Sequence, residues 1–195
     1  MFRTLRLVGA DLRRKASWCY ESESPAAQLK ALTTDGTASM LLYRLMQASR
    51  RHGLGPLEMV FNKLNAASGC IIGRGAEFGP GFVLVHSNGV VINGAVRGGR
   101  NVMIEHQVTI GAERRESPEL GDDVFIGAGA KIIGSVTIGD RAKVGANAVV
   151  LKDVPADTTV VGIPAKPIER KHEGRQERGT SADPSLGKSD DRPNR

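Results

Sequence analysis

A six-residue repeat of apolar side chains runs through the middle of the chain and limits what the chain can fold into. Counted from Ile72 in steps of six, thirteen of the fourteen positions as far as Val150 are apolar. An α-helix repeats every 3.6 residues and a plain β-strand every two, so neither explains this period. The positions are Ile72, Phe78, Leu84, Val90, Val96, Val102, Val108, Arg114, Leu120, Ile126, Ile132, Ile138, Val144 and Val150.

The repeat is typical of a parallel β-helix with three flat faces. Six residues form one face with one inward aliphatic side chain, and three faces complete a coil. Inward side chains of successive coils then stack about 4.8 Å apart, and glycine fits the corners because it lacks a Cβ atom. A narrow triangular interior also explains why only 4% of the residues are aromatic.

The segments on either side of the repeat have a different pattern of apolar and polar residues. The apolar pattern predicts helices over residues 39–51 and around residues 57–64, separated by the Gly-Leu-Gly-Pro sequence at 53–56. Residues 171–195 are polar and cannot bury enough apolar area to become ordered. We therefore expect a mainly β protein with an α-helical region at 1–68, a β-helix domain at 69–170 and a disordered tail at 171–195.

Charge and composition restrict the choice of partners. Lys and Arg outnumber Asp and Glu by 27 to 21, and five of the basic residues lie within the first fifteen positions. We interpret those five as the solvated face of a first helix rather than a docking segment for an anionic surface. They are Arg3, Arg6, Arg13, Arg14 and Lys15, and Asp11 lies among them. Without interleaved aromatic residues, nucleic-acid binding is not expected.

Localisation is expected to be cytoplasmic. No apolar run reaches 18 residues, so no membrane span is predicted. The N-terminus lacks the apolar core of a secretory signal. Cys19 and Cys70 are the only cysteines, which fits a reducing compartment.

The repeat is interrupted once. Residues 112–119 read AERRESPE, and the six-residue phase resumes at Leu120. The charges and Pro118 favour a loop that projects from the β-helix. Loops on a rigid scaffold commonly carry function.

Several stretches resemble the serine acetyltransferases, a family of hexapeptide-repeat acyltransferases with a left-handed β-helix. The resemblance covers roughly residues 37–170. It implies acetyl transfer from acetyl-CoA to a small hydroxyl acceptor, L-serine in that family, as a step of cysteine biosynthesis. It also implies a trimer or a dimer of trimers, with active sites between neighbouring subunits. The matching stretches are 42–45 (LYRL), 52–54 (HGL), 85–92 (VHSNGVVI), 108–111 (VTIG), 126–132 (IGAGAKI), 144–146 (VGA), 150–155 (VLKDVP) and 162–166 (GIPAK).

Three departures from the family pattern concern the acceptor. The family carries an acidic residue before the catalytic His, where this chain has Val85. Its Asp-Ile-His-Pro segment aligns with residues 71–74 (IIGR), and its Arg-His-Pro loop aligns with residues 116–118 (ESP). A sugar or surface-polysaccharide hydroxyl is therefore the alternative acceptor, and a non-catalytic β-helix scaffold is a second alternative.

His86 is the predicted general base. A hydroxyl becomes a good nucleophile only as its proton is removed, and imidazole suits that task near neutral pH. The family match at residues 85–89 favours this role over that of a surface histidine at a turn. Glu105 and Glu116 are candidates to orient His86. His106 falls at an inward position of its repeat, which favours a partly buried side chain over a supporting role beside the acceptor.

The resemblance places acetyl-CoA along the C-terminal coils. Ala128 and Ala146 match positions where small residues let the pantetheine arm approach the backbone, although small residues also simply fit corners. Lys143, Lys152 and Lys166 offer positive charge for the cofactor phosphates. No metal is expected: a carbonic anhydrase of this fold needs three histidines. The β-helix holds only His86 and His106, with His52 and His172 outside it.

Overall fold

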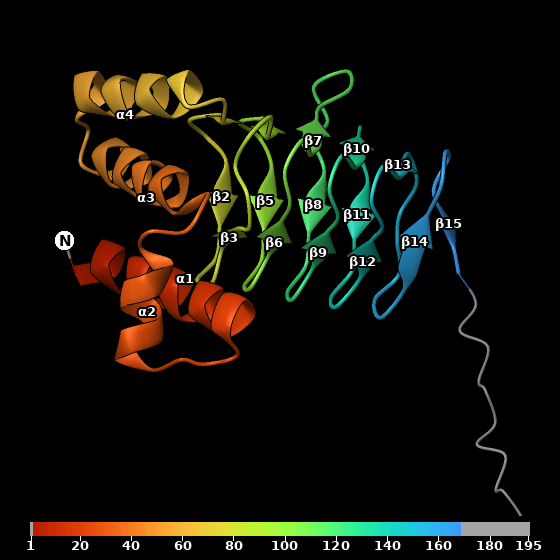
Figure 1. Cartoon of the computed structure of the whole chain (residues 1–195). Helices are drawn as coiled ribbons and strands as arrows, with labels where there is room; N and C mark the ends of the chain where they lie inside the picture. Colours follow the sequence, from red (N-terminus) through yellow and green to blue (C-terminus); the bar gives the residue numbers. More distant parts are fainter. Residues whose placement is uncertain (1, 169–195) are drawn as a thin grey trace, which may run out of the picture.

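The computed structural model describes residues 2–168, with helices packed at one end of a parallel β-helix (Figure 1). The predicted tail at 171–195 lies outside the described residues. The helices are α1 (Phe2–Tyr20), α2 (Pro25–Ala31), α3 (Thr37–Arg51) and α4 (Gly55–Ala67). The predicted break between the last two is confirmed, and Pro56 lies in the first turn of α4, where its missing N–H costs nothing.

Short strands follow one another around three faces of the β-helix. Sheet A has the order β1-β4-β7-β10-β13, sheet B the order β11-β8-β5-β2, and sheet C the order β15-β14-β12-β9-β6-β3. The pairing is parallel except between β14 and β15. The strands are β1 (Ile71–Ile72), β2 (Glu77–Phe78), β3 (Val83–Leu84), β4 (Val91–Ile92), β5 (Arg97–Gly98), β6 (Met103–Ile104), β7 (Thr109–Gly111), β8 (Glu119–Leu120), β9 (Phe125–Ile126), β10 (Lys131–Ile133), β11 (Thr137–Ile138), β12 (Lys143–Val144), β13 (Val149–Val150), β14 (Thr159–Val161) and β15 (Lys166–Pro167).

The predicted fold class, a left-handed parallel β-helix with an α-helical N-terminal region, is confirmed. Its interior is filled by aliphatic side chains such as Ile104, Ile126 and Ile132, which are fully buried. Met40 and Tyr43 of α3 belong to the same hydrophobic core. The helices and the β-helix therefore share one core, and the division at residues 68 and 69 into separate domains stays a prediction.

Between Val90 and Val108, the predicted six-residue phase is wrong by two residues. Leu84 in β3 is followed by Ile92 at the inward position of β4, eight residues later instead of six. The strand positions then run through Gly98, Ile104 and Ile110. The valines at 90, 96, 102 and 108 are also buried, but each lies two residues before its strand position.

The predicted loop follows β7 and restores the phase. Ten residues separate Ile110 from Leu120, four more than one face needs. The extra two residues before Ile92 and the extra four before Leu120 add up to six, which is one full repeat. The apolar pattern of the sequence therefore resumes at Leu120 in its original phase. Glu113 and Glu116 pair across the loop, and Arg114 and Arg115 form its tip with positive φ angles. The loop projects beyond the coils (Figure 1).

The basic N-terminal segment is only partly a solvated face. Arg3, Arg6 and Arg13 are exposed as expected. Asp11 and Lys15, however, are buried. Asp11 accepts hydrogen bonds from the Arg44 side chain at 2.7 Å and from the backbone N–H of Phe82 at 2.9 Å. This ion pair joins α1, α3 and the start of β3.

The apolar face predicted for α4 is only partly covered by the described residues. Phe61 packs against the hydrophobic core, but the other three side chains of that face do not. Leu57, Val60 and Leu64 are 42%, 50% and 51% exposed. Among residues 2–168, no helix combines the length and the apolar character that crossing a membrane would require.

Candidate active site

His86 lies where the chain leaves β3, and a carboxylate faces it. Its Nδ1 atom is 3.2 Å from Oδ2 of Asp35, which lies in the connection between α2 and α3. A carboxylate only accepts hydrogen bonds, so Nδ1 donates and Nε2 remains the basic nitrogen. The His86 side chain is 51% exposed, so a substrate hydroxyl can reach it.

Backbone contacts hold the Asp35 loop against β3. Gly36 has a φ of +77°, and a Cβ there would come within 2.4 Å of the Leu84 carbonyl oxygen. Only glycine tolerates both conditions. The buried Lys15 ammonium donates to the Leu84 carbonyl at 2.8 Å and to the carbonyl of Asp35. Burial lowers the pKa of Lys15 to about 8.

Neither glutamate suggested by the sequence orients His86. Glu105 faces the other histidine, with Oε2 3.5 Å from Nδ1 of His106. Glu116 lies in the projecting loop. Asp35 precedes His86 by 51 positions in a polar connection, and the β-helix repeat carries no information about that connection.

His106 does not point inward as its position in the repeat suggested. Because the phase shifts by two residues, His106 follows Ile104 as His86 follows Leu84, one coil apart. The two imidazole rings lie with centroids 5.9 Å apart at 75°. The side chain of His106 is 43% exposed.

One corner of the β-helix carries both histidines and both predicted alanines. The pairing of sheet C aligns Leu84, Ile104, Ile126 and Val144. Two residues beyond each of these lie His86, His106, Ala128 and Ala146. Backbone hydrogen bonds continue along the corner, from Gly129 N–H to His106 at 2.9 Å and from Asn147 N–H to Ala128 at 2.8 Å. The corner is thus a track with a step of about 4.8 Å per coil.

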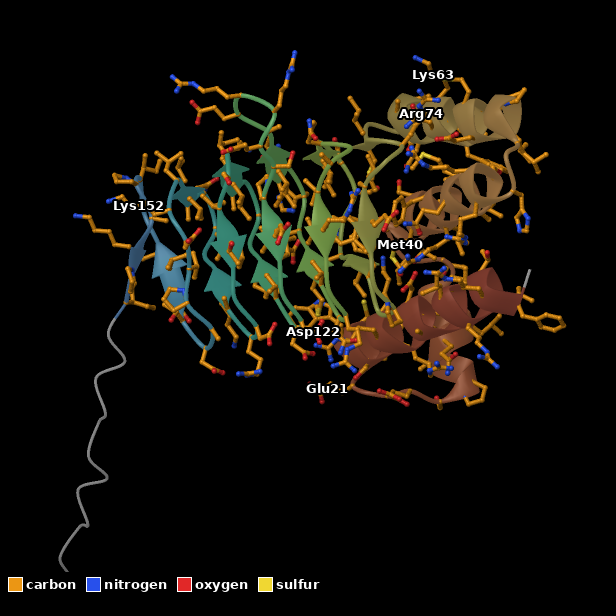
Figure 2. The ribbon with its side chains drawn as sticks, turned by 180° about the vertical axis from the view of Figure 1, so that it is seen from behind. Glu21, Met40, Lys63, Arg74, Asp122 and Lys152 are labelled. Carbon is orange, nitrogen blue, oxygen red and sulfur yellow. The ribbon has the colours of Figure 1, made fainter. Side chains whose placement is uncertain are left out.

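Two of the three predicted lysines come together. Lys152 and Lys166 line a cavity of about 390 Å³ between β13 and β15. Lys143 lies in β12 and does not line it. Figure 2 shows Lys152 at the end of the molecule opposite the helices. Within residues 2–168, no group of three or more His, Cys, Asp or Glu side chains has a metal-binding arrangement.

Together, the β-helix, the histidine–carboxylate pair at its corner and the small residues along that corner define a hexapeptide-repeat acyltransferase. The family model described as bacterial transferase hexapeptide (six repeats) matches residues 117–152. A serine acetyltransferase from Helicobacter pylori is 38% identical over 156 residues, which cover 76% of this chain and 91% of that protein. The chain belongs to the serine acetyltransferase family.

Solved structures of that family superimpose on the chain. The serine acetyltransferase from Neisseria gonorrhoeae gives a TM-score of 0.79 at 32% identity, covering 87% of this chain and 66% of that one. A serine acetyltransferase in complex with CoA gives 0.72 at 27% identity, covering 82% of this chain and 68% of that one. The chain thus spans about two thirds of the length of these solved relatives.

Proposed function

We propose that the protein is an acetyl-CoA-dependent O-acetyltransferase that uses His86 as general base, with L-serine as the acceptor that the family implies. The observation that carries this proposal is the contact of 3.2 Å between Nδ1 of His86 and Asp35 at the corner of the β-helix. The similarity to serine acetyltransferases supports both the reaction and the acceptor.

The pair can move one proton in each half of the reaction. Acetyl-CoA supplies the acetyl group as a thioester. Nε2 of His86 takes the proton of the acceptor hydroxyl as the hydroxyl oxygen attacks the carbonyl carbon of the thioester. Asp35 holds Nδ1–H and stabilises the imidazolium that forms. His86 then returns the proton to the departing sulfur, which leaves the base ready for another cycle.

The corner track supports a binding path for the cofactor. Ala128 lies two coils from His86 and Ala146 three, so a pantetheine arm laid along this corner would meet small side chains and backbone groups. Lys152 and Lys166 line a cavity farther along the molecule, where they can attract phosphates. Lys143 is exposed on β12 and lies outside that cavity, so it is the weakest of the three candidates for binding the cofactor phosphates.

Charge reversal tests the cofactor lysines. Lys152→Glu and Lys166→Glu should weaken CoA binding much more than binding of a pantetheine fragment without the nucleotide, and the effect should shrink with added salt. Lys30→Glu, on exposed helix α2, is the matched control. Equal losses for CoA and the fragment would remove these lysines from the phosphate site.

A sugar hydroxyl is the second candidate acceptor. Val85 stands where the family has an acidic residue, and it packs against Val83 and Met103. The departures at 71–74 and 116–118 remove further groups that the family associates with serine. A panel of serine, homoserine and sugar acceptors with acetyl-CoA decides between the candidates. Turnover of serine alone supports the first, and turnover of a sugar alone supports the second.

We also propose that the protein works as a homotrimer in the cytoplasm. Apolar side chains on α4 and on the adjacent sheet A remain exposed, as expected of a surface that other subunits cover. They are Leu57, Val60, Leu64, Ile71 and Val91. Cys19 and Cys70 are both free thiols, which fits a reducing compartment.

A further inference from the structure

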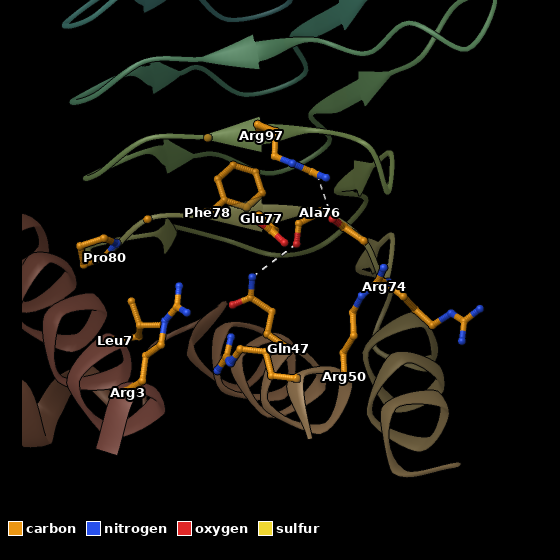
Figure 3. A pocket seen from close by; sticks show the side chains of 14 residues that line it. Arg3, Leu7, Gln47, Arg50, Arg74, Ala76, Glu77, Phe78, Pro80 and Arg97 are labelled. Atoms are coloured by element: carbon orange, nitrogen blue, oxygen red, sulfur yellow. Dashed lines mark hydrogen bonds between the residues drawn. The ribbon is translucent and has the colours of Figure 1, made fainter. Parts of the chain in front are cut away.

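A second cavity lies where α1 and α3 face sheet B, and arginines surround it (Figure 3). Its volume is about 600 Å³. The guanidinium groups come from four parts of the chain: α1, α3 and its C-terminus, the connection between β1 and β2, and β5. They belong to Arg3, Arg50, Arg51, Arg74 and Arg97.

The cavity carries a large excess of positive charge. Glu77 is the one acidic residue among the described residues that line it. Arg50 is also 3.7 Å from Glu58, but its side chain remains 56% exposed. Partial burial, and then the charges of Arg3 and Arg44, lower the pKa of Arg51. Like charges held this close repel one another, and a bound anion would relieve that repulsion.

Hydrogen bonds hold part of the cluster in position. Arg97 donates to the carbonyl of Gly75 at 2.9 Å, and Arg51 donates to the Thr4 hydroxyl at 3.0 Å. Figure 3 shows Arg3 and Arg50 extending from α1 and α3 toward sheet B, and the end of Arg97 turned toward the connection between β1 and β2. A site whose donors are already placed loses less entropy when a ligand binds.

We propose that this cavity binds an organic diphosphate, such as a nucleoside diphosphate or the diphosphate of an activated sugar. Guanidinium forks match phosphate oxygens in pairs, which favours arginine over lysine in a phosphate site. The volume exceeds what two phosphates need and falls in the range of small-molecule sites. Leu7 and Pro80 add apolar surface for the organic part.

The diphosphate site is separate from the acetyl-transfer site. None of the residues that line it is His86, Asp35 or His106, and none comes from the C-terminal coils. The proposal therefore does not depend on which hydroxyl the protein acetylates.

The test measures binding of pyrophosphate and of ADP to the full chain by calorimetry at low salt. Arg3→Gln and Arg74→Gln should each weaken binding of both probes about tenfold, the loss expected when one charged hydrogen-bond donor is removed. Arg13→Gln removes an exposed arginine from the same helix as Arg3, and Lys30→Gln removes an exposed charge from α2, which belongs to neither proposed phosphate site. Both controls should bind the probes as the wild type does. Unchanged thermal unfolding shows that each variant is folded.

The two probes also distinguish the sources of the diphosphate. Tighter binding of ADP than of pyrophosphate would place the organic part in the cavity, and equal binding would mean that the phosphates alone are held. Three results would overturn the proposal. The first is that neither probe binds, and the second is that inorganic phosphate binds as tightly as pyrophosphate. The third is that a control variant loses as much affinity as the two arginine variants.

Discussion

Lys15 links the first helix to the candidate active site through a single buried ammonium group. It donates to the carbonyl of Leu84, two residues before His86, and to the carbonyl of Asp35, whose side chain faces His86. Burying a cation costs free energy unless its donors are satisfied. These carbonyls satisfy them, and the position of Asp35 thereby depends on α1.

The pH dependence of stability should reveal Lys15. Its pKa is about 8 in the folded chain, against an ordinary value of 10.5, so between these values the unfolded chain binds more protons. Stability should therefore rise with pH through this window, by roughly 2 kcal/mol between pH 7.5 and 9.5 relative to Lys15→Met. Urea unfolding of both proteins at the two pH values measures the difference. Parallel behaviour of the two would show that Lys15 keeps its ordinary pKa.

Asp35 should matter for turnover and not for folding. Asp35→Asn keeps the shape but cannot fix the same imidazole tautomer, so kcat should fall at least about tenfold. CoA affinity and thermal unfolding should stay unchanged because Asp35 is 82% exposed. Asp35→Glu should recover part of the rate. Glu116→Gln, in the projecting loop, is the control, and an equal loss there would argue against a specific role for Asp35.

The sequence predicts His86 as the general base but does not predict the carboxylate that faces it. His86 lies inside a local motif and follows an inward strand residue, so pattern and chemistry both select it. Asp35 lies in a helix connection whose path depends on how Gly36 and Lys15 pack against Leu84. That packing is tertiary, and the local sequence pattern does not contain it.

The positions of the strands show what the six-residue repeat can and cannot predict about secondary structure. The six-residue period predicts the β-helix and its buried residues, because inward side chains must be apolar. It does not show which of two buried positions, two residues apart, belongs to the strand. Two insertions that add to six residues kept the pattern apparently unbroken from Ile72 to Val150. The uncorrected phase placed His106 at an inward position, whereas the two-residue shift places it beside His86.

The inward register can be tested within one strand. Ile132 is fully buried in β10, and Lys131 precedes it on the outer face. Ile132→Asp places an unpaired charge in the core and should cost at least about 3 kcal/mol, enough to unfold much of the protein. Lys131→Asp should leave the protein folded. Circular dichroism and thermal unfolding distinguish the two, and a fully folded Ile132→Asp protein would contradict the register.

Among the described residues, α4 and the adjacent sheet A expose the apolar side chains that we propose a trimer covers. Val60→Asp with Leu64→Asp places two charges on the outer face of α4 and should convert a trimer to monomers. Light scattering after size-exclusion chromatography measures the mass. Leu29→Asp changes an apolar residue of α2 that is 68% exposed and should leave the trimer intact. A wild-type protein that is already monomeric would refute the trimer.

The candidate sites occupy different parts of the molecule. The arginine cavity lies beside the helices, and Lys152 and Lys166 lie at the opposite end. His86 begins the corner track that leads from the helical end toward the lysines. The proposed function places proton transfer and cofactor binding on separate coils, so a change in one should leave the other intact.

The most direct test of that layout is the His86→Ala variant, assayed with the acceptor that the panel identifies. Acetyl transfer should fall roughly 10²–10⁴-fold, the contribution of a general base. His86→Asn, which is polar but not basic, should fail nearly as badly. CoA affinity, measured by calorimetry, should barely change in either variant. Full acetyl transfer by His86→Ala would contradict the account and would remove His86 from the mechanism.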